Sequence, residues 1–186
     1  MGLVGILLIA SPILGTAIHL QNAEPYSELY VLQPNHLASY YALNLTEGQN
    51  YSYILGATNH LTHSAYYLLN VKFRNSSDAL PDLKAKTPSA LPELYEYRFI
   101  IPDNGTWEMP LNFSISNASI STLQSVIKTL IINGEGIQVD KSSSWNSTKN
   151  SSYYQLFFEL WLFNTQNQTF QFNNRFVGLS MNFTKT

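Results

Sequence analysis

Two histidines stand close enough in the sequence to suggest a metal site. His60 and His63 form the run H-L-T-H, a spacing that can bring two imidazoles to one metal. Zinc sites use three or four ligands, however, and the sequence marks no third ligand nearby. On a strand, residues three apart also point to opposite faces. The pattern favours a histidine that caps a turn through Asn59-His60, and we expect no metal and no cofactor.

The sequence shows no arrangement of residues typical of catalysis. Glu93 and Glu96 are the nearest pair of carboxylates, but they fall on opposite faces of a strand predicted over 95–101, so we interpret them as surface charges. There is no G-x-S-x-G serine and no phosphate loop, and Asn133-Gly-Glu-Gly136 is interpreted as a turn. The chain has no cysteine, which excludes disulfides and thiol chemistry. We expect a protein that is not an enzyme.

Asparagine sequons are the strongest chemical signal in the chain. Ten N-x-[ST] triplets occur without an intervening proline, where the content of Asn, Ser and Thr predicts about three by chance. The alternative is that loops rich in Asn and Ser generate such triplets by accident. We predict N-linked glycans, and with them an extracytoplasmic location. The predicted glycosylation sites are Asn44, Asn50, Asn75, Asn104, Asn112, Asn117, Asn146, Asn150, Asn167 and Asn182.

The composition agrees with a folded domain that has few charges. Of the 186 residues, 45% are hydrophobic and only 12% are charged, with a net charge of −2. The chain can bury a substantial core, and no basic run indicates binding to nucleic acid. Twelve tyrosines raise the option of carbohydrate stacking. Tyr51 and Tyr53 share a strand phase with Leu55, however, so we expect most tyrosines in the core or on the sheet surface.

The first 22 residues form a hydrophobic segment. Residues 2–20 carry no Asp, Glu, Lys or Arg and are long enough to cross a bilayer as a helix. Three alternatives remain: a signal peptide cleaved after Ala17 or Ala23, a buried apolar strand, or a fragment that lacks an upstream membrane region. We expect a membrane anchor or signal segment at 1–22 and an extracytoplasmic domain at 23–186.

Alternation of apolar and polar residues predicts about seven strands after this segment. Pro110 indicates an edge or a bulge in one of them. The almost continuously apolar run YYQLFFELWLF predicts a central strand, whereas 75–92 is predicted to be a long exposed connection. Residues 120–132 show helical spacing and end at Asn133-Gly134, which favours a short helix over a β-rich run. This pattern indicates an immunoglobulin-like β-sandwich. The predicted strands are 29–31, 51–57, 65–73, 95–101, 107–115, 153–163 and 177–183.

The runs YSELYVLQP, LNLTEGQN, ILGATNH, NGTWEMPLNFS and YQLFFELWLF resemble the archaeal family called domain of unknown function 1616. The resemblance covers about half of the chain, within 27–73, 99–117 and 153–183. It implies membrane proteins whose soluble part is an immunoglobulin-like sandwich outside the cell, and it implies no activity. The chain departs from the family in having Leu61 after His60, where an acidic residue is usual. It also has one candidate membrane helix where larger members have several, and apparent insertions at about 75–92 and 118–145.

Together these features predict a non-catalytic, membrane-anchored, N-glycosylated archaeal surface protein with a structural or protein-interaction role. Its expected partners are the membrane, through residues 2–20, and other protein subunits of the same or different chains. Two alternatives stay open. One is a subunit of an extracellular filament joined by strand complementation, and the other is an accessory subunit of a membrane protein complex.

Overall fold

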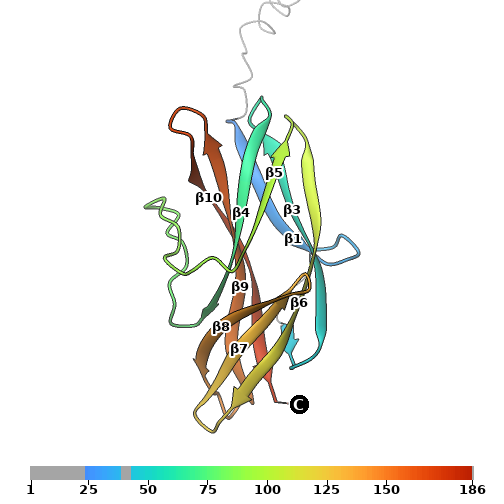
Figure 1. Cartoon of the computed structure of the whole chain (residues 1–186), viewed down its shortest axis with the longest axis vertical. Coiled ribbons are helices and arrows are strands. Elements are labelled where there is room, and N and C mark those ends of the chain that lie inside the picture. Colours follow the sequence, from blue (N-terminus) through green and yellow to red (C-terminus); the bar gives the residue numbers. More distant parts are fainter. Residues whose placement is uncertain (1–23, 39–42, 186) are drawn as a thin grey trace, which may run out of the picture.

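The computed structural model describes residues 24–38 and 43–185 of the chain (Figure 1). The predicted anchor or signal segment at 1–22 lies outside the described residues. Within the described ranges, no helix is both long and apolar enough to cross a membrane.

The described chain is built from ten strands in two five-stranded sheets. The first sheet has the order β1-β3-β6-β7-β8, and the second has the order β2-β10-β9-β4-β5. The prediction of a mainly β protein is confirmed, but the expected number of about seven strands is too low. The strands are β1 Tyr26–Leu32, β2 Leu43–Leu45, β3 Asn50–His60, β4 Ala65–Asn75, β5 Tyr95–Ile101, β6 Thr106–Ile120, β7 Gln124–Ile132, β8 Glu135–Ser144, β9 Ser151–Asn164 and β10 Thr169–Thr184.

The start of the chain is shared between the two sheets. β1 pairs antiparallel with β3, and β2 then pairs in parallel with the last residues of β10. The chain thus connects the two sheets at one edge. There the Arg175 Nε of β10 also donates a hydrogen bond to the Ser27 carbonyl oxygen of β1 at 3.2 Å.

Alternating side chains from both sheets fill one core. In β4 and β9 the inward positions are fully or almost fully buried, among them Tyr67, Leu69, Tyr154 and Phe158. Aromatic rings link the layers, since Phe99 of β5 stacks on Trp107 of β6 with centroids 3.8 Å apart. As predicted, β9 is a central strand, and it is buried on both faces over most of its length.

The helix predicted over 120–132 is wrong. Gln124–Ile132 forms strand β7, which pairs with β6 and β8. A register shift between Ile127 and Thr129 puts Ile127 and Leu130 on the same buried face, and this bulge imitates the spacing of a helix. Asn133 and Gly134, with φ of 50° and 88°, form the tight turn of the β7–β8 hairpin, where both central residues need positive φ. They do not end a helix.

Two other predictions about local structure are confirmed in part. Pro110 lies where β6 pairs with β3 on one side, because the pairing with β7 begins only at Phe113. The missing N–H of Pro110 therefore removes no bond to β7. The connection over 76–94 is mostly exposed, as predicted, but Pro81 and Ser89 within it are buried.

Candidate functional site

The outer face of the second sheet carries the polar and aromatic groups with the most unusual environments. Residues on this face alternate with the core positions of β4, β9 and β10. They form two regions. One, near the middle of the sheet, is covered by the 76–94 connection, and the other, near the turns that end β9 and begin β4, is not.

A buried ion pair fixes the covered region. The Lys72 Nζ lies 3.0 Å from the Glu159 Oε2, and the two side chains are 3% and 0% exposed. Both groups also bind the backbone of Ser89, since Lys72 donates to its carbonyl oxygen at 2.7 Å and Glu159 accepts from its N–H at 2.8 Å. Phe157, on the same face, is fully buried without belonging to the central core. The ion pair thus holds the connection against the sheet.

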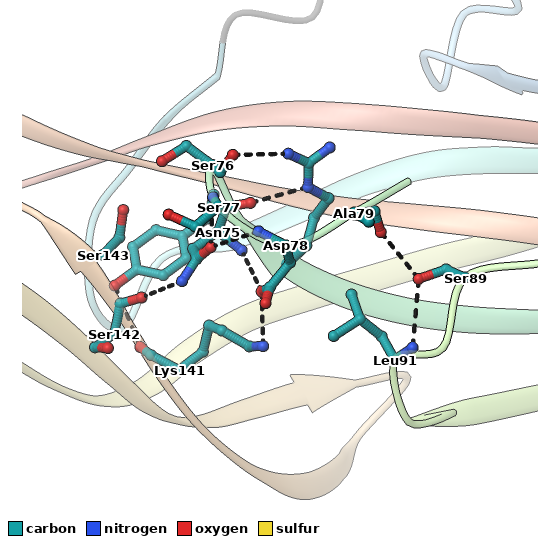
Figure 2. A network of polar contacts seen from close by, with 12 residues as sticks. Asn75, Ser76, Ser77, Asp78, Ala79, Ser89, Leu91, Lys141, Ser142 and Ser143 are labelled. Atoms are coloured by element: carbon teal, nitrogen blue, oxygen red, sulfur yellow. Dashed lines mark hydrogen bonds and ion pairs between the residues drawn. The ribbon is translucent and has the colours of Figure 1, made fainter. Parts of the chain in front are cut away.

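A second polar network ties the beginning of the connection to the first sheet (Figure 2). The Asp78 Oδ2 lies 2.8 Å from the Lys141 Nζ on β8, and the Asn75 Nδ2 donates to the Ser142 carbonyl oxygen at 2.8 Å. Burial acts to raise the pKa of Asp78, but the bonds from Lys141 and from the Asn75 backbone N–H hold it below its ordinary value of 3.8. Asp78 is therefore charged at neutral pH.

The uncovered region is an aromatic surface. Tyr66, Phe163 and Phe170 lie on β4, β9 and β10, and their ring centroids are 5.1 to 5.7 Å apart. The Arg98 guanidinium lies 5.6 Å above the Phe170 ring. All three rings are partly exposed. We call Tyr66, Trp161, Phe163, Phe170 and Phe172 the aromatic face.

A cleft of about 650 Å³ opens beside the aromatic face, at the end of the sheet. We call it the end cleft. Tyr66, Phe163 and Phe172 supply its aromatic wall, and among the residues that the structure describes no Asp, Glu, Lys or Arg lines it. The remaining lining is rich in side-chain amides, from Asn164, Gln166, Gln171 and Asn173. The cleft can therefore accept a ligand that is neutral and partly apolar.

The predicted histidine motif belongs to a structural corner. Asn59 is fully buried, and its amide donates to the carbonyl oxygens of His63 and Ile101 and accepts from the Leu61 N–H and the Tyr67 hydroxyl. Burial raises the pKa of Tyr67.

The two histidines have separate surroundings. The His60 Nδ1 lies 3.1 Å from the Asn104 Oδ1, and its ring lies 4.7 Å from that of Tyr26, whereas His63 lines the end cleft. No group of three or more His, Asp or Glu residues suited to a metal occurs in the part of the chain that the structure describes.

The two carboxylates noted in the sequence have different partners. Glu93 accepts a hydrogen bond from the Asn70 Nδ2 at 2.7 Å, and Glu96 pairs with Arg98 at 2.9 Å. Asn70, which bonds to Glu93, pairs in register with Glu96 of β5 on one side and with Glu159 of β9 on the other.

The asparagines of all ten predicted sequons reach solvent. Eight are exposed, and the other two, Asn75 and Asn182, are partly buried. The Asn75 Nδ2 bonds to Ser142, and its Oδ1 accepts from the N–H groups of Ser77 and Asp78. The amide of the exposed Asn104 is engaged as well, with Asp103 and His60. A glycan on Asn75 would have to replace or reorient part of this network.

Sequence reasoning missed both the buried ion pair and the aromatic face. Lys72 and Glu159 each lie on a strand that was identified correctly, but their pairing depends on which strands are neighbours. A charged residue on the otherwise apolar run YYQLFFELWLF was the one available signal for Glu159.

Comparison with protein families identifies the family of this chain. The model of the family described as "Domain of unknown function (DUF1616)" matches residues 20–157. Because this range is well over half of the chain, the chain belongs to that family. No curated protein matches it.

Solved structures show only distant likeness. A β-glucosidase from Listeria innocua in complex with glucose aligns with 7% identity and a TM-score of 0.44, over 87% of this chain and 16% of its own length. The C-terminal domain of wzt aligns with 8% identity and a TM-score of 0.37, over 88% and 80%. A family 123 glycoside hydrolase from Clostridium perfringens aligns with 8% identity and a TM-score of 0.38, over 84% and 27%. The chain thus spans about a sixth of the length of the β-glucosidase.

Proposed function

We propose that this family member is a non-catalytic, membrane-anchored, N-glycosylated archaeal surface protein with a structural or protein-interaction role. The observation that carries the proposal is the position of the sequons. Ten asparagines that were identified by sequence alone all fall at positions open to solvent, and none falls in the core. A glycan must project into water, so buried sequons would have weakened the proposal.

We also propose that the two sheets form an immunoglobulin-like sandwich. The placement of the first two strands, β1 and β2, in different sheets and the single shared core support this assignment. The order of the strands along the chain differs from that of an immunoglobulin domain in one respect. β7, the neighbour of β6, and the edge strand β8 both follow β6 in the chain, whereas strand D of an immunoglobulin domain, the neighbour of strand E, precedes it.

Mass spectrometry of the protein purified from native membranes tests glycosylation. We expect glycan mass on most sequon peptides, with the lowest occupancy at Asn75 because it is partly buried and its amide bonds across to β8. Asn167→Gln should remove one glycan. Asn164→Gln is the matched control, because it lies in the same turn region outside any sequon and should leave the glycan mass unchanged. A native protein with the bare mass of the chain would overturn the proposal.

A second candidate function is a filament subunit, and one observation favours it. β10 pairs with β9 along its length, but its other side pairs with β2 only at Met181–Phe183. Within the described residues no strand pairs with that side over 169–180, although β1 lies against β10 and Arg175 bonds to Ser27 there. A strand from another subunit would therefore add beside that contact. Electron microscopy of the mature protein should then show polymers, and monodisperse particles would exclude this candidate.

A further inference from the structure

We propose that the end cleft is a binding site for a neutral glycan of one or two sugar residues. The inference rests on the proposed function in one respect: it takes the domain to lie outside the cell, where such glycans are found. The site itself is argued from the chemistry of the cleft.

The first support is the combination of groups that line the cleft. Tyr66, Phe163 and Phe172 present aromatic carbon, and Gln166 and Gln171 present exposed amides near them. Sugar rings have an apolar face of C–H groups, which packs on aromatic rings, and a rim of hydroxyls, which both donate and accept hydrogen bonds. Carboxamides also do both, so the lining complements the two parts of a sugar.

The second support is the scarcity of charge in the lining. No Asp, Glu, Lys or Arg lines the cleft within the described residues, so it has no carboxylate for an amine, and His63 is the one lining side chain that can become cationic. The nearby Arg98 already pairs with Glu96. A volume of about 650 Å³ lies in the range of small-ligand sites, which favours a small ligand over a protein surface.

The third support is an irregularity in β10 at the edge of the cleft. The register with β9 shifts between Phe172 and Arg175, so Asn173 and Asn174 bulge out of the pairing, and Asn174 has φ of 53°. Bulges re-aim side chains and are frequent beside functional sites. Here the bulge brings Asn173 into the cleft lining.

Two buried polar atoms near the bulge also lack partners. In the described part of the chain, neither the Trp161 Nε1 nor the Asn174 Oδ1 has a hydrogen-bond partner. The Trp161 ring packs on Phe172, with centroids 5.8 Å apart. Neither residue lines the end cleft, so these two atoms lie beside the site and are not among the groups that it offers to a ligand.

Binding should be measured with the full-length protein in detergent by isothermal titration calorimetry. The probes are four neutral disaccharides, namely maltose, cellobiose, mannobiose and N,N′-diacetylchitobiose. We expect at least one to bind, with Phe163→Ala weakening binding at least tenfold. Gln171→Ala removes an exposed amide that accepts a hydrogen bond from the Asn164 Nδ2 at 3.3 Å, and it should weaken binding at least threefold. Leu123→Ala is the control, because Leu123 is 81% exposed and adjoins β7 in the other sheet.

Three results would overturn the inference. The first is no heat with any of the four probes up to about 10 mM, which is tenfold above a Kd of about 1 mM. The second is binding unchanged in both Phe163→Ala and Gln171→Ala. The third is binding of an acidic disaccharide, titrated beside the four probes, when none of the neutral probes binds. A second experiment compares binding of free disaccharides with binding of glycopeptides from the cell surface. It shows whether the cleft takes free sugars or glycans attached to protein, because both carry the same sugar chemistry. Because binding is measured in vitro, a failure to bind sugars would not change the result on glycosylation. Likewise, a native protein without glycans would not change the result on sugar binding.

Discussion

The ion pair between Lys72 and Glu159 predicts a specific pattern of stability changes. Glu159→Gln keeps the shape of the side chain and an acceptor for the Ser89 N–H, but it leaves the Lys72 ammonium buried without its counter-ion. Removing one partner of a buried pair costs about 3–5 kcal/mol. For a chain of this length, a loss of 3 kcal/mol lowers the melting temperature by about 6–12 °C. Lys72→Met should cost a similar amount, because it leaves the Glu159 carboxylate buried.

The double variant Lys72→Met/Glu159→Gln separates the ion pair from simple packing. It removes both charges and leaves mainly the Ser89 carbonyl oxygen without its donor, at a cost of about 1–3 kcal/mol. We therefore expect the double variant to be no less stable than the worse of the two single variants. Urea unfolding measures all four proteins of this cycle, and hydrogen exchange reports on the Ser89 amide. A double variant whose loss equals the sum of the single losses would refute the coupling that we infer.

Three further predictions concern single residues elsewhere in the fold. Asn59→Ala should cost about 3 kcal/mol or more in urea unfolding, since several buried groups lose their partner at once, and a cost below 1 kcal/mol would contradict the corner described above. Because the pKa of Asp78 is lowered on folding, its contribution to stability is full above about pH 4 and is lost as the pH falls through the folded pKa. Asp78→Asn should therefore destabilise the protein at pH 7 but not at low pH, and an equal loss at both would rule out the pairing with Lys141. Gly56→Ala should cost about 1–2 kcal/mol, because a Cβ there would lie 2.2 Å from the Tyr30 ring, and the loss should vanish in a Tyr30→Ala background.

The sequence revealed most strands because one face of each is buried, which imposes alternation. It failed at β7, where the bulge after Ile127 changes the phase, and a pattern of period two cannot be recognised across such a shift. It also failed at β8, whose alternate positions include Lys141 and Ser143 in place of large apolar residues. The three-residue β2 is too short to show any period.

The candidate sites also differ in whether the sequence alone reveals them. Sequons are local patterns, so the sequence located all ten, whereas the end cleft is formed by residues from four strands and the turns between them. Phe163 and Phe170 are seven residues apart in the sequence, and only the β9–β10 register makes them neighbours. Tyr66 joins them from β4, a strand nearly a hundred residues earlier in the chain. Such a surface cannot be recognised before the order of the strands is known.

The exterior location of the domain is the central claim, and surface labelling of intact cells tests it most directly. Lys84 and Lys86 are exposed in the 76–94 connection, whereas Lys72 is 3% exposed and serves as an internal control for folding. With an amine reagent that does not cross membranes, we predict labelling of Lys84 and Lys86 in intact cells and none of Lys72. Labelling of Lys84 and Lys86 only after the cells are lysed would contradict the claim.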